Sequence, residues 1–167
     1  MAASIDLFID EVTDIYDNHG IYLWGGNGEL TKSLTIYKII NDETGLTNAS
    51  RVLSHISQLL KEGHDLTRSK AVDCSGLVVA ALRKCGAIGP SSDYRACDFQ
   101  KMCKSVKLKK LKKGDLVFNE VSKATHVGVY DGEKVIEAQG RDVGVTRRDL
   151  SKGNWIIGGR LPASVLI

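Results

Sequence analysis

The cysteine at position 74 has the setting of a nucleophile. It follows Asp73 and precedes Ser75-Gly76, at the start of a run whose apolar residues recur with helical spacing. A thiol in the first turn of a helix feels the positive end of the helix dipole, which favours the nucleophilic thiolate. Gly76 is a poor helix former, so we expect another part of the chain to approach the helix backbone closely there. The alternative is a buried structural cysteine, because free cysteines are among the most buried residues. That alternative is our interpretation of the other three cysteines, Cys85, Cys97 and Cys103.

A histidine and a glutamate on a predicted β-hairpin could serve such a nucleophile. Asp131-Gly132 is a preferred two-residue type I′ turn, flanked by THVGVY and EKVIEA. In that register His126 lies directly opposite Glu137, so the two side chains share one face of the sheet. A carboxylate beside an imidazole orients the ring and stabilises the imidazolium, as the third member of a triad does. The alternative is a solvent-exposed pair, and a slip of one residue would turn Glu137 to the other face.

Other residues near this pair are interpreted more simply. Gly128 lies two residues from His126 on the same predicted face and leaves room for a helix to approach. The remaining histidines, His19, His55 and His64, have no comparable partner. Two of them, His19 and His64, follow predicted helices, and we interpret them as caps or surface residues.

The elements that must hold these groups begin with helices. Ser4 can cap a first helix that stops near Gly20, and Asn48 can cap another that ends at Gly63. Segment 20–30, GIYLWGGNGEL, is too rich in glycine for a helix interior and is predicted to be a loop. Further helices are predicted over residues 31–41, 48–62, 74–85 and 93–104.

After Gly114 the pattern changes to short runs rich in Val and Ile, separated by Gly and Asp, which is typical of strands and turns. These runs are DLVF, THVGVY, KVIEA, VGVTR and NWIIGGRL. Helices followed by strands predict an α+β domain, with N-terminal helices packed on a C-terminal antiparallel sheet and the Cys74 helix against that sheet. No repeat or linker interrupts the chain, so residues 1–167 are predicted to form one domain.

The composition excludes several classes of protein. A chain of 167 residues with 43% hydrophobic and 26% charged residues is typical of a globular domain. No stretch approaches the roughly 18 apolar residues of a membrane-spanning helix. The first residues lack the basic and apolar regions of a secretory signal. The cysteine spacing is poor for zinc. A domain with this much apolar content does not need a disulfide scaffold, so we expect reduced thiols. We also expect no metal and no organic cofactor.

The positive charge is concentrated in one segment. No acidic residue lies between Asp98 and Asp115, a stretch that holds seven lysines. We interpret this segment as a solvated face, and the alternative is attraction to a polyanion such as wall teichoic acid. The lysines are not interleaved with aromatic residues and no recognised motif accompanies them, so we expect no nucleic-acid partner.

Four segments in a fixed order resemble the NlpC-type cell-wall peptidases, which are papain-like enzymes that hydrolyse peptide bonds in the stem peptide of bacterial peptidoglycan. The segments are YLWGG (22–26), DCSGLV (73–78), GDLVF (114–118) and HVGVY (126–130). The resemblance spans residues 20–28 and 71–160, and the combination is specific although each segment alone is weak.

The resemblance implies a role for individual residues. Cys74 takes the place of the nucleophile and His126 that of the general base. The third polar residue of the family is usually His, Asn or Gln; Glu137 stands there in this chain, with Gln139 as the fallback. Tyr22 resembles a tyrosine whose hydroxyl lines the site and helps to stabilise the oxyanion. The backbone at the helix start would add N–H donors. The remaining substrate-binding candidates are Asp73, Ser75 and Trp24.

The implied reaction is acyl transfer. Cys74 attacks an amide carbonyl, His126 protonates the leaving amine, and water hydrolyses the thioester. The same residues suit an amidase or acyltransferase acting on a different amide. A third alternative is a non-catalytic wall-binding module that uses Tyr22, Trp24 and the lysine-rich face.

Residues 29–72 depart from the family, in which a short link usually joins the YLWGG and DCSGLV segments. We interpret them as a helical insertion that shapes the substrate groove. The segment IEAQGRDVGV resembles members that phages carry as lysins or tail enzymes. We therefore expect a monomer that acts on peptidoglycan outside the cell membrane, without inserting into it, after release or delivery by another route.

Overall fold

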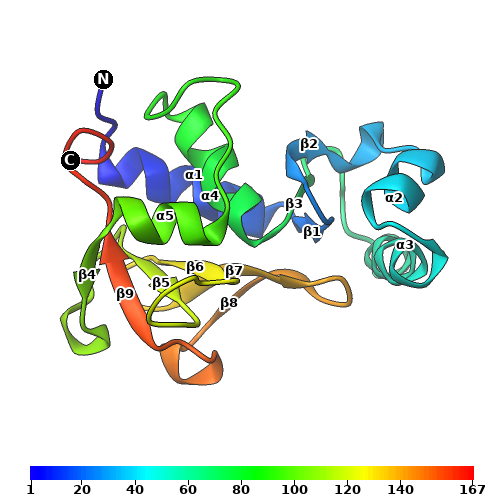
Figure 1. Cartoon of the computed structure of the whole chain (residues 1–167). Helices are drawn as coiled ribbons and strands as arrows, with labels where there is room; N and C mark the ends of the chain where they lie inside the picture. Colours follow the sequence, from blue (N-terminus) through cyan, green and yellow to red (C-terminus); the bar gives the residue numbers. More distant parts are fainter.

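Helices cover one face of a six-stranded sheet in the computed structural model, which describes residues 1–167 (Figure 1). Every neighbouring pair of strands in this sheet is antiparallel, in the order β4-β9-β5-β6-β7-β8. The strands are β4 (Lys104–Val106), β5 (Leu116–Phe118), β6 (Val127–Tyr130), β7 (Val135–Gly140), β8 (Gly144–Arg148) and β9 (Ile157–Arg160). The helices on this face are α1 (Ile5–Asp17), α4 (Cys74–Lys84) and α5 (Ala96–Met102). The predicted α+β class is confirmed.

The first helix begins where the sequence predicts. The Ser4 hydroxyl accepts hydrogen bonds from the N–H groups of Asp6 (3.1 Å) and Leu7 (3.5 Å), which satisfies donors that a helix start leaves unpaired. Its apolar stripe, including Phe8 and Val12, is fully buried in the main core. The chain ends meet beside this helix, since the Ile167 N–H donates to the Ala3 carbonyl.

Helix α4 is the central element of the main core. Leu77 and Leu82 are completely buried and pack with Val129 and Ile136 of the sheet. Full burial of one such side chain contributes roughly 1.5–3 kcal/mol. The helix that begins at Cys74 is therefore firmly fixed against β6 and β7.

A second, three-stranded sheet lies at the end of the main body, in the order β1-β3-β2. Its strands are β1 (Ile21–Tyr22), β2 (Asn27–Leu30) and β3 (Lys70–Val72). The loop prediction for residues 20–30 is therefore wrong in part. The partner residues on β3 are 40 to 50 positions away in sequence, so the local glycine content could not reveal this pairing.

Between β2 and β3 the chain forms two helices, α2 (Ile36–Asp42) and α3 (Leu46–Lys61), preceded by a short 3-10 turn over Thr31–Ser33. They lie at one end of the molecule (Figure 1) and share a small core with β1 and β3. Asn48 is not the cap of α3, as predicted, but lies inside its first turn. The Gly45 N–H closes the end of α2 on the Ile40 carbonyl, and the chain runs from there directly into α3.

The β6–β7 hairpin has a different register from the predicted one. Tyr130 pairs with Val135 and Val129 with Ile136, so the turn is centred on Gly132-Glu133 and the predicted Asp131-Gly132 turn is wrong. The cause is the Asp131 side chain, whose Oδ1 accepts the N–H groups of Glu133 (2.9 Å) and Lys134 (2.8 Å). Such local side-chain bonds compete with the simplest hairpin turn.

The lysine-rich segment contains strand β4, which the sequence analysis missed, and a 3-10 turn over Leu108–Lys110. Strand β4 lies at the edge of the six-stranded sheet. Lysines are typical of exposed edge strands, where they discourage pairing with other chains. No helix of the protein is both long and apolar enough to cross a membrane.

Candidate active site

Cys74 is the first residue of α4, and Asp73 caps that helix. Asp73 Oδ1 accepts the Gly76 N–H at 2.7 Å and Oδ2 accepts the Gly25 N–H at 2.9 Å. Its own N–H donates to the Gly26 carbonyl at 3.0 Å. Asp73 therefore ties the Tyr22–Gly26 segment to the helix start. The Cys74 N–H has no acceptor within the helix, because it belongs to the first turn.

Gly76 permits this close contact. A Cβ atom at position 76 would lie 1.8 Å from the carbonyl oxygen of Gly26. The expected close approach of another segment to the helix is thus confirmed. The approaching segment is YLWGG, and it makes the contact through its last residue, Gly26.

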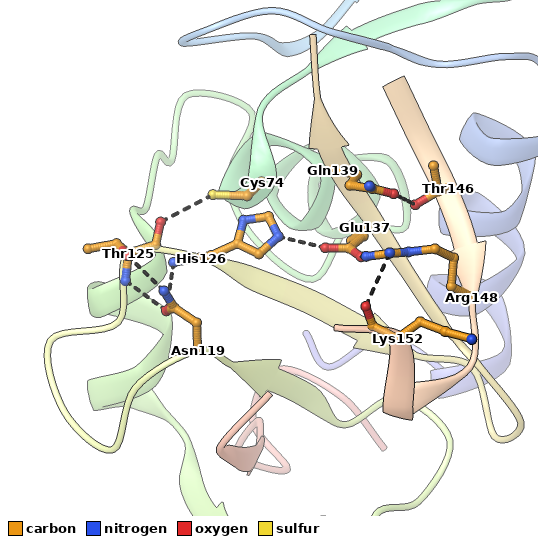
Figure 2. A network of polar contacts seen from close by, with 9 residues as sticks. All are labelled: Cys74, Asn119, Thr125, His126, Glu137, Gln139, Thr146, Arg148 and Lys152. Carbon is orange, nitrogen blue, oxygen red and sulfur yellow. Dashed lines mark hydrogen bonds and ion pairs between the residues drawn. The ribbon is translucent and has the colours of Figure 1, made fainter. Parts of the chain in front are cut away.

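The ring of His126 lies between Cys74 and Glu137 (Figure 2). His126 Nε2 is 2.6 Å from Glu137 Oε2, and Cys74 Sγ is 3.8 Å from the carbonyl oxygen of Thr125. Burial lowers the pKa of His126, but the neighbouring Cys74 side chain and the hydrogen bond with Glu137 outweigh it and raise that pKa to about 9. The imidazolium is thus the stable form of His126 at neutral pH.

Glu137 meets His126 for a different reason from the one predicted. In the observed register Glu137 falls opposite Gly128, and His126 lies diagonally from it, just before β6. The turn lies one residue further along the chain than predicted. This shift changes the partner of each β7 residue by two positions, so Glu137 stays on the predicted face of the sheet. Diagonal neighbours are still within reach of long side chains.

Glu137 also binds Arg148, a residue that the sequence analysis missed. Arg148 donates to Glu137 Oε1 at 2.5 Å and to the Lys152 carbonyl at 3.2 Å. Burial opposes ionisation of Glu137, but hydrogen bonds from His126 and Arg148 outweigh it and lower the pKa of the carboxyl. Glu137 pairs with Thr146 on β8, and Arg148 follows two residues later on the same face, so only this non-local pairing brings it to Glu137.

Asn119 and Trp155 hold His126 from two sides and were also missed. Asn119 Oδ1 accepts the N–H groups of Thr125 (3.1 Å) and His126 (3.0 Å). The Trp155 ring stacks on the imidazole at 5.3 Å between centroids, with the planes 11° apart. Gly128 makes room for Trp155, since a Cβ there would lie 3.0 Å from that ring. The prediction that a helix occupies this space is wrong, because α4 packs on the opposite face of the sheet.

Tyr22 lies beside Cys74. Burial and then the charges of Cys74 and Asp73 raise the pKa of Tyr22 to about 12, so its hydroxyl stays protonated and can donate. The guanidinium carbon of Arg141 is 5.2 Å from the centroid of the Tyr22 ring. Trp24 is 57% exposed at the rim of the same cleft.

One cleft of about 590 Å³ brings most of the predicted site residues together. Those that line it are Tyr22, Trp24, Asp73, Cys74, Ser75 and His126. Lys101 and Lys123 also line it. Glu137 and Gln139 instead line a separate pocket behind His126, together with Arg148 and Trp155. Gln139 accepts a hydrogen bond from the Thr146 hydroxyl at 3.0 Å and does not contact the imidazole (Figure 2).

Cys97 also lines this cleft, whereas Cys85, Cys103 and the remaining histidines do not. All four cysteines are free thiols. Burial raises the pKa of Cys85, and it raises that of Cys103 to about 12. His19 and His64 stack on each other with centroids 4.0 Å apart. No group of three or more His, Cys, Asp or Glu side chains is placed to hold a metal ion.

This chain belongs to the NlpC/P60 family, whose model matches residues 62–157. Solved structures agree with that assignment. The NlpC/p60 domain of the peptidoglycan hydrolase SagA is 15% identical, with a TM-score of 0.57 over 95% of this chain and 99% of that one. The P60 domain of an antigen from M. avium subspecies paratuberculosis is 18% identical, with a TM-score of 0.57 over 94% and 96% of the two chains.

A third solved structure, the peptidoglycan hydrolase RipB from Mycobacterium tuberculosis, is 20% identical, with a TM-score of 0.57 over 94% of this chain and 66% of that one. At these identities the likeness establishes the fold alone. No curated protein matches the chain significantly.

Proposed function

We propose that this protein is a cysteine peptidase that hydrolyses amide bonds in the stem peptides of bacterial peptidoglycan. The observation that carries the proposal is the His126 ring held between Cys74, at a helix start, and the Glu137 carboxylate. Membership of the NlpC/P60 family supports the reaction class. The names of SagA and RipB as peptidoglycan hydrolases support the substrate.

In the first half of the reaction, the Cys74 thiolate attacks the carbonyl carbon of the scissile amide. The oxyanion that forms faces the Cys74 N–H and the hydroxyl of Tyr22, and both can donate to it. His126 then gives its proton to the amide nitrogen, the C–N bond breaks, and the amine leaves. The acyl group remains on Cys74 as a thioester.

In the second half, the now neutral His126 takes a proton from water. The resulting hydroxide attacks the thioester carbonyl, the C–S bond breaks, and the carboxylic acid leaves as the Cys74 thiolate returns. His126 thus alternates between imidazolium and imidazole. Glu137 stabilises the charged form, and Arg148 keeps that carboxylate ionised and in place.

Digestion of purified peptidoglycan tests this proposal. Mass spectrometry of the released muropeptides should show a new amine and a new carboxyl group within the stem peptide. The Cys74→Ala protein is the control and should release nothing. Cleavage at the amide that joins the peptide to the sugar would indicate an amidase, and transfer of the acyl group to an added amine an acyltransferase. Binding without release by the wild-type protein would favour a wall-binding module.

We also propose that residues 1–167 act as one monomeric catalytic domain, with residues 29–72 as its insertion, on the outer side of the cell membrane. A role as a phage lysin or tail enzyme is supported by the segment IEAQGRDVGV alone. Addition of the protein to intact bacteria and to isolated walls, with light scattering as the readout, tests that role. Clearing of walls but not of cells would contradict action from outside.

A further inference from the structure

The carboxylate of Glu43 lies between three segments of the molecule. Glu43 follows α2, inside the insertion and outside the residues that match the family model. Its side chain has no exposed surface. Oε1 accepts the Trp24 N–H at 2.8 Å, and Oε2 accepts a hydrogen bond from Arg141 Nε. A fully buried carboxylate costs free energy unless it is paired, and here both oxygens are used.

Arg141 continues this chain of contacts to the site. It belongs to the turn between β7 and β8, the two strands that carry Glu137 and Arg148. Its guanidinium lies over the ring of Tyr22, an arrangement that attracts a cation to the aromatic face. Tyr22 lines the same cleft as Cys74, and its hydroxyl is the proposed oxyanion donor. Glu43 therefore bonds to the backbone of Trp24 at the rim of the cleft. It also bonds to Arg141, the cation that packs on Tyr22.

We propose that Glu43 and Arg141 are positioning residues for the active site. Glu43 fixes the backbone at Trp24 and the head group of Arg141, and Arg141 fixes the ring of Tyr22 so that its hydroxyl stays beside Cys74. This inference rests on the proposed function. It gives the helical insertion a direct part in shaping the catalytic cleft through one side chain.

The chain offers a matched control for this inference. Arg51 of α3 makes two hydrogen bonds to Asp142, at 2.9 and 2.7 Å, and so joins the same insertion to the same β7–β8 turn. Both side chains are well exposed, at 45% and 63%, and neither contacts Tyr22 or Trp24. Exposed ion pairs contribute little to stability. Arg51 therefore controls for the loss of a cation between the insertion and this turn, and the Tyr22→Phe background separates a positioning role from a structural one.

Steady-state kinetics on a soluble muropeptide distinguish the two roles. Loss of one oxyanion donor lowers kcat about 10²–10³-fold, so a misplaced Tyr22 in Arg141→Met should lower kcat about 10-fold or more with KM unchanged. Arg141→Lys should recover part of this loss, and Arg51→Met should leave kcat unchanged. In the Tyr22→Phe background, Arg141→Met should cause no further loss, because its effect passes through the tyrosine. Equal effects of Arg51→Met and Arg141→Met, or losses that add in the Tyr22→Phe background, would overturn the inference.

A second measurement needs no substrate. Amide hydrogen exchange at Trp24, followed by NMR, should become at least 10-fold faster in Glu43→Ala and stay unchanged in Arg51→Met. Glu43→Gln keeps an acceptor and should lie between them. If the wild-type protein does not cut peptidoglycan, the proposed function fails but this exchange still decides the positioning role. Unchanged exchange at Trp24 in both Glu43 variants would overturn it.

Discussion

The two oxygens of Glu137 have different partners. Oε2 is bonded to His126 and Oε1 to Arg148, and the residue as a whole is 3% exposed. A neutral His, Asn or Gln at this place could orient an imidazole through a hydrogen bond. A carboxylate adds a charge that stabilises the imidazolium, and it needs Arg148 because an unpaired buried charge is costly. The proposed triad is therefore better described as a group of four residues that includes Arg148.

The charge of Glu137 leads to the first prediction. Glu137→Gln keeps the shape but removes the charge, so kcat should fall by ~10²–10⁴, the upper figure being the loss for the corresponding change in a serine-protease triad. Steady-state kinetics on a muropeptide measure this. Gln139→Ala, on the same face and without contact to the imidazole, is the control and should retain activity. Loss in the Gln139 variant with wild-type turnover in the Glu137 variant would reverse the assignment.

The second prediction concerns thiol reactivity. Iodoacetamide near neutral pH should modify Cys74 before the other cysteines, because it lies at a helix start beside the His126 imidazolium. Cys85 and Cys103 should be slow, since burial raises their pKa. Cys97 is the most informative comparison because it lines the same cleft. Peptide mapping over a time course gives the four rates, and equal rates for Cys74 and Cys97 would argue against a catalytic thiolate.

At the scale of elements, the contact between α4 and the Tyr22–Gly26 segment depends on Gly76. Alanine favours a helix interior by about 1 kcal/mol over glycine. A Cβ at 1.8 Å from the Gly26 oxygen, however, forces backbone atoms apart, and overpacking typically costs about 1–3 kcal/mol. The clash therefore outweighs the gain in helix propensity.

Gly76→Ala should accordingly lower the melting temperature and activity together, because the segment that carries Tyr22 must move away from Cys74. Thermal unfolding followed by circular dichroism and a muropeptide assay measure the two effects. Gly140→Ala is a suitable control, since nothing lies within 4 Å of a Cβ there. A Gly76→Ala protein as stable and active as the wild type would contradict the close approach.

The elements also explain which parts of the site could be predicted from sequence. The α4 start follows from local signals, an Asp73 cap and an apolar stripe, and both operate within one helix. Glu137 was predicted on the correct face although the predicted turn was wrong, because side chains alternate along a strand with a period of two and the pairing shifted by two positions. Arg148 and Trp155 were missed because their contacts with Glu137 and His126 depend on the pairing of β7 with β8 and on a loop that folds back. No local pattern encodes those contacts.

At the scale of the whole molecule, two hydrophobic cores hold different groups of elements together. The main core holds α4 against the sheet, and the smaller core holds α2 and α3 on β1 and β3. Strand β1 belongs to the smaller core through Ile21 and to the main core through Tyr22. Helices α2 and α3 thus pack on the strand that supplies the candidate oxyanion donor. Sequence analysis predicted an insertion there, but the buried Glu43–Arg141 pair joins residues 98 positions apart and had no local signature.

The stability of the whole molecule should depend on the state of His126. Its pKa is about 9 in the folded protein against an ordinary value of 6.5, so folding favours the protonated form. The stabilising contribution is complete below pH 6.5 and is lost as the pH rises through 9. Activity should decline over the same upper range, because only the imidazolium can protonate the leaving amine.

Urea unfolding of the wild type and of His126→Gln between pH 6 and 10 measures the contribution of His126 to the free energy of unfolding. The difference between their free energies of unfolding should be greatest at the acid end and shrink toward pH 10. His64→Gln, a change at a partly buried histidine that lies apart from the site, is the control and should leave the wild-type profile unchanged. A difference between wild type and His126→Gln that stays constant across this range would mean that His126 is not held as an imidazolium in the folded protein.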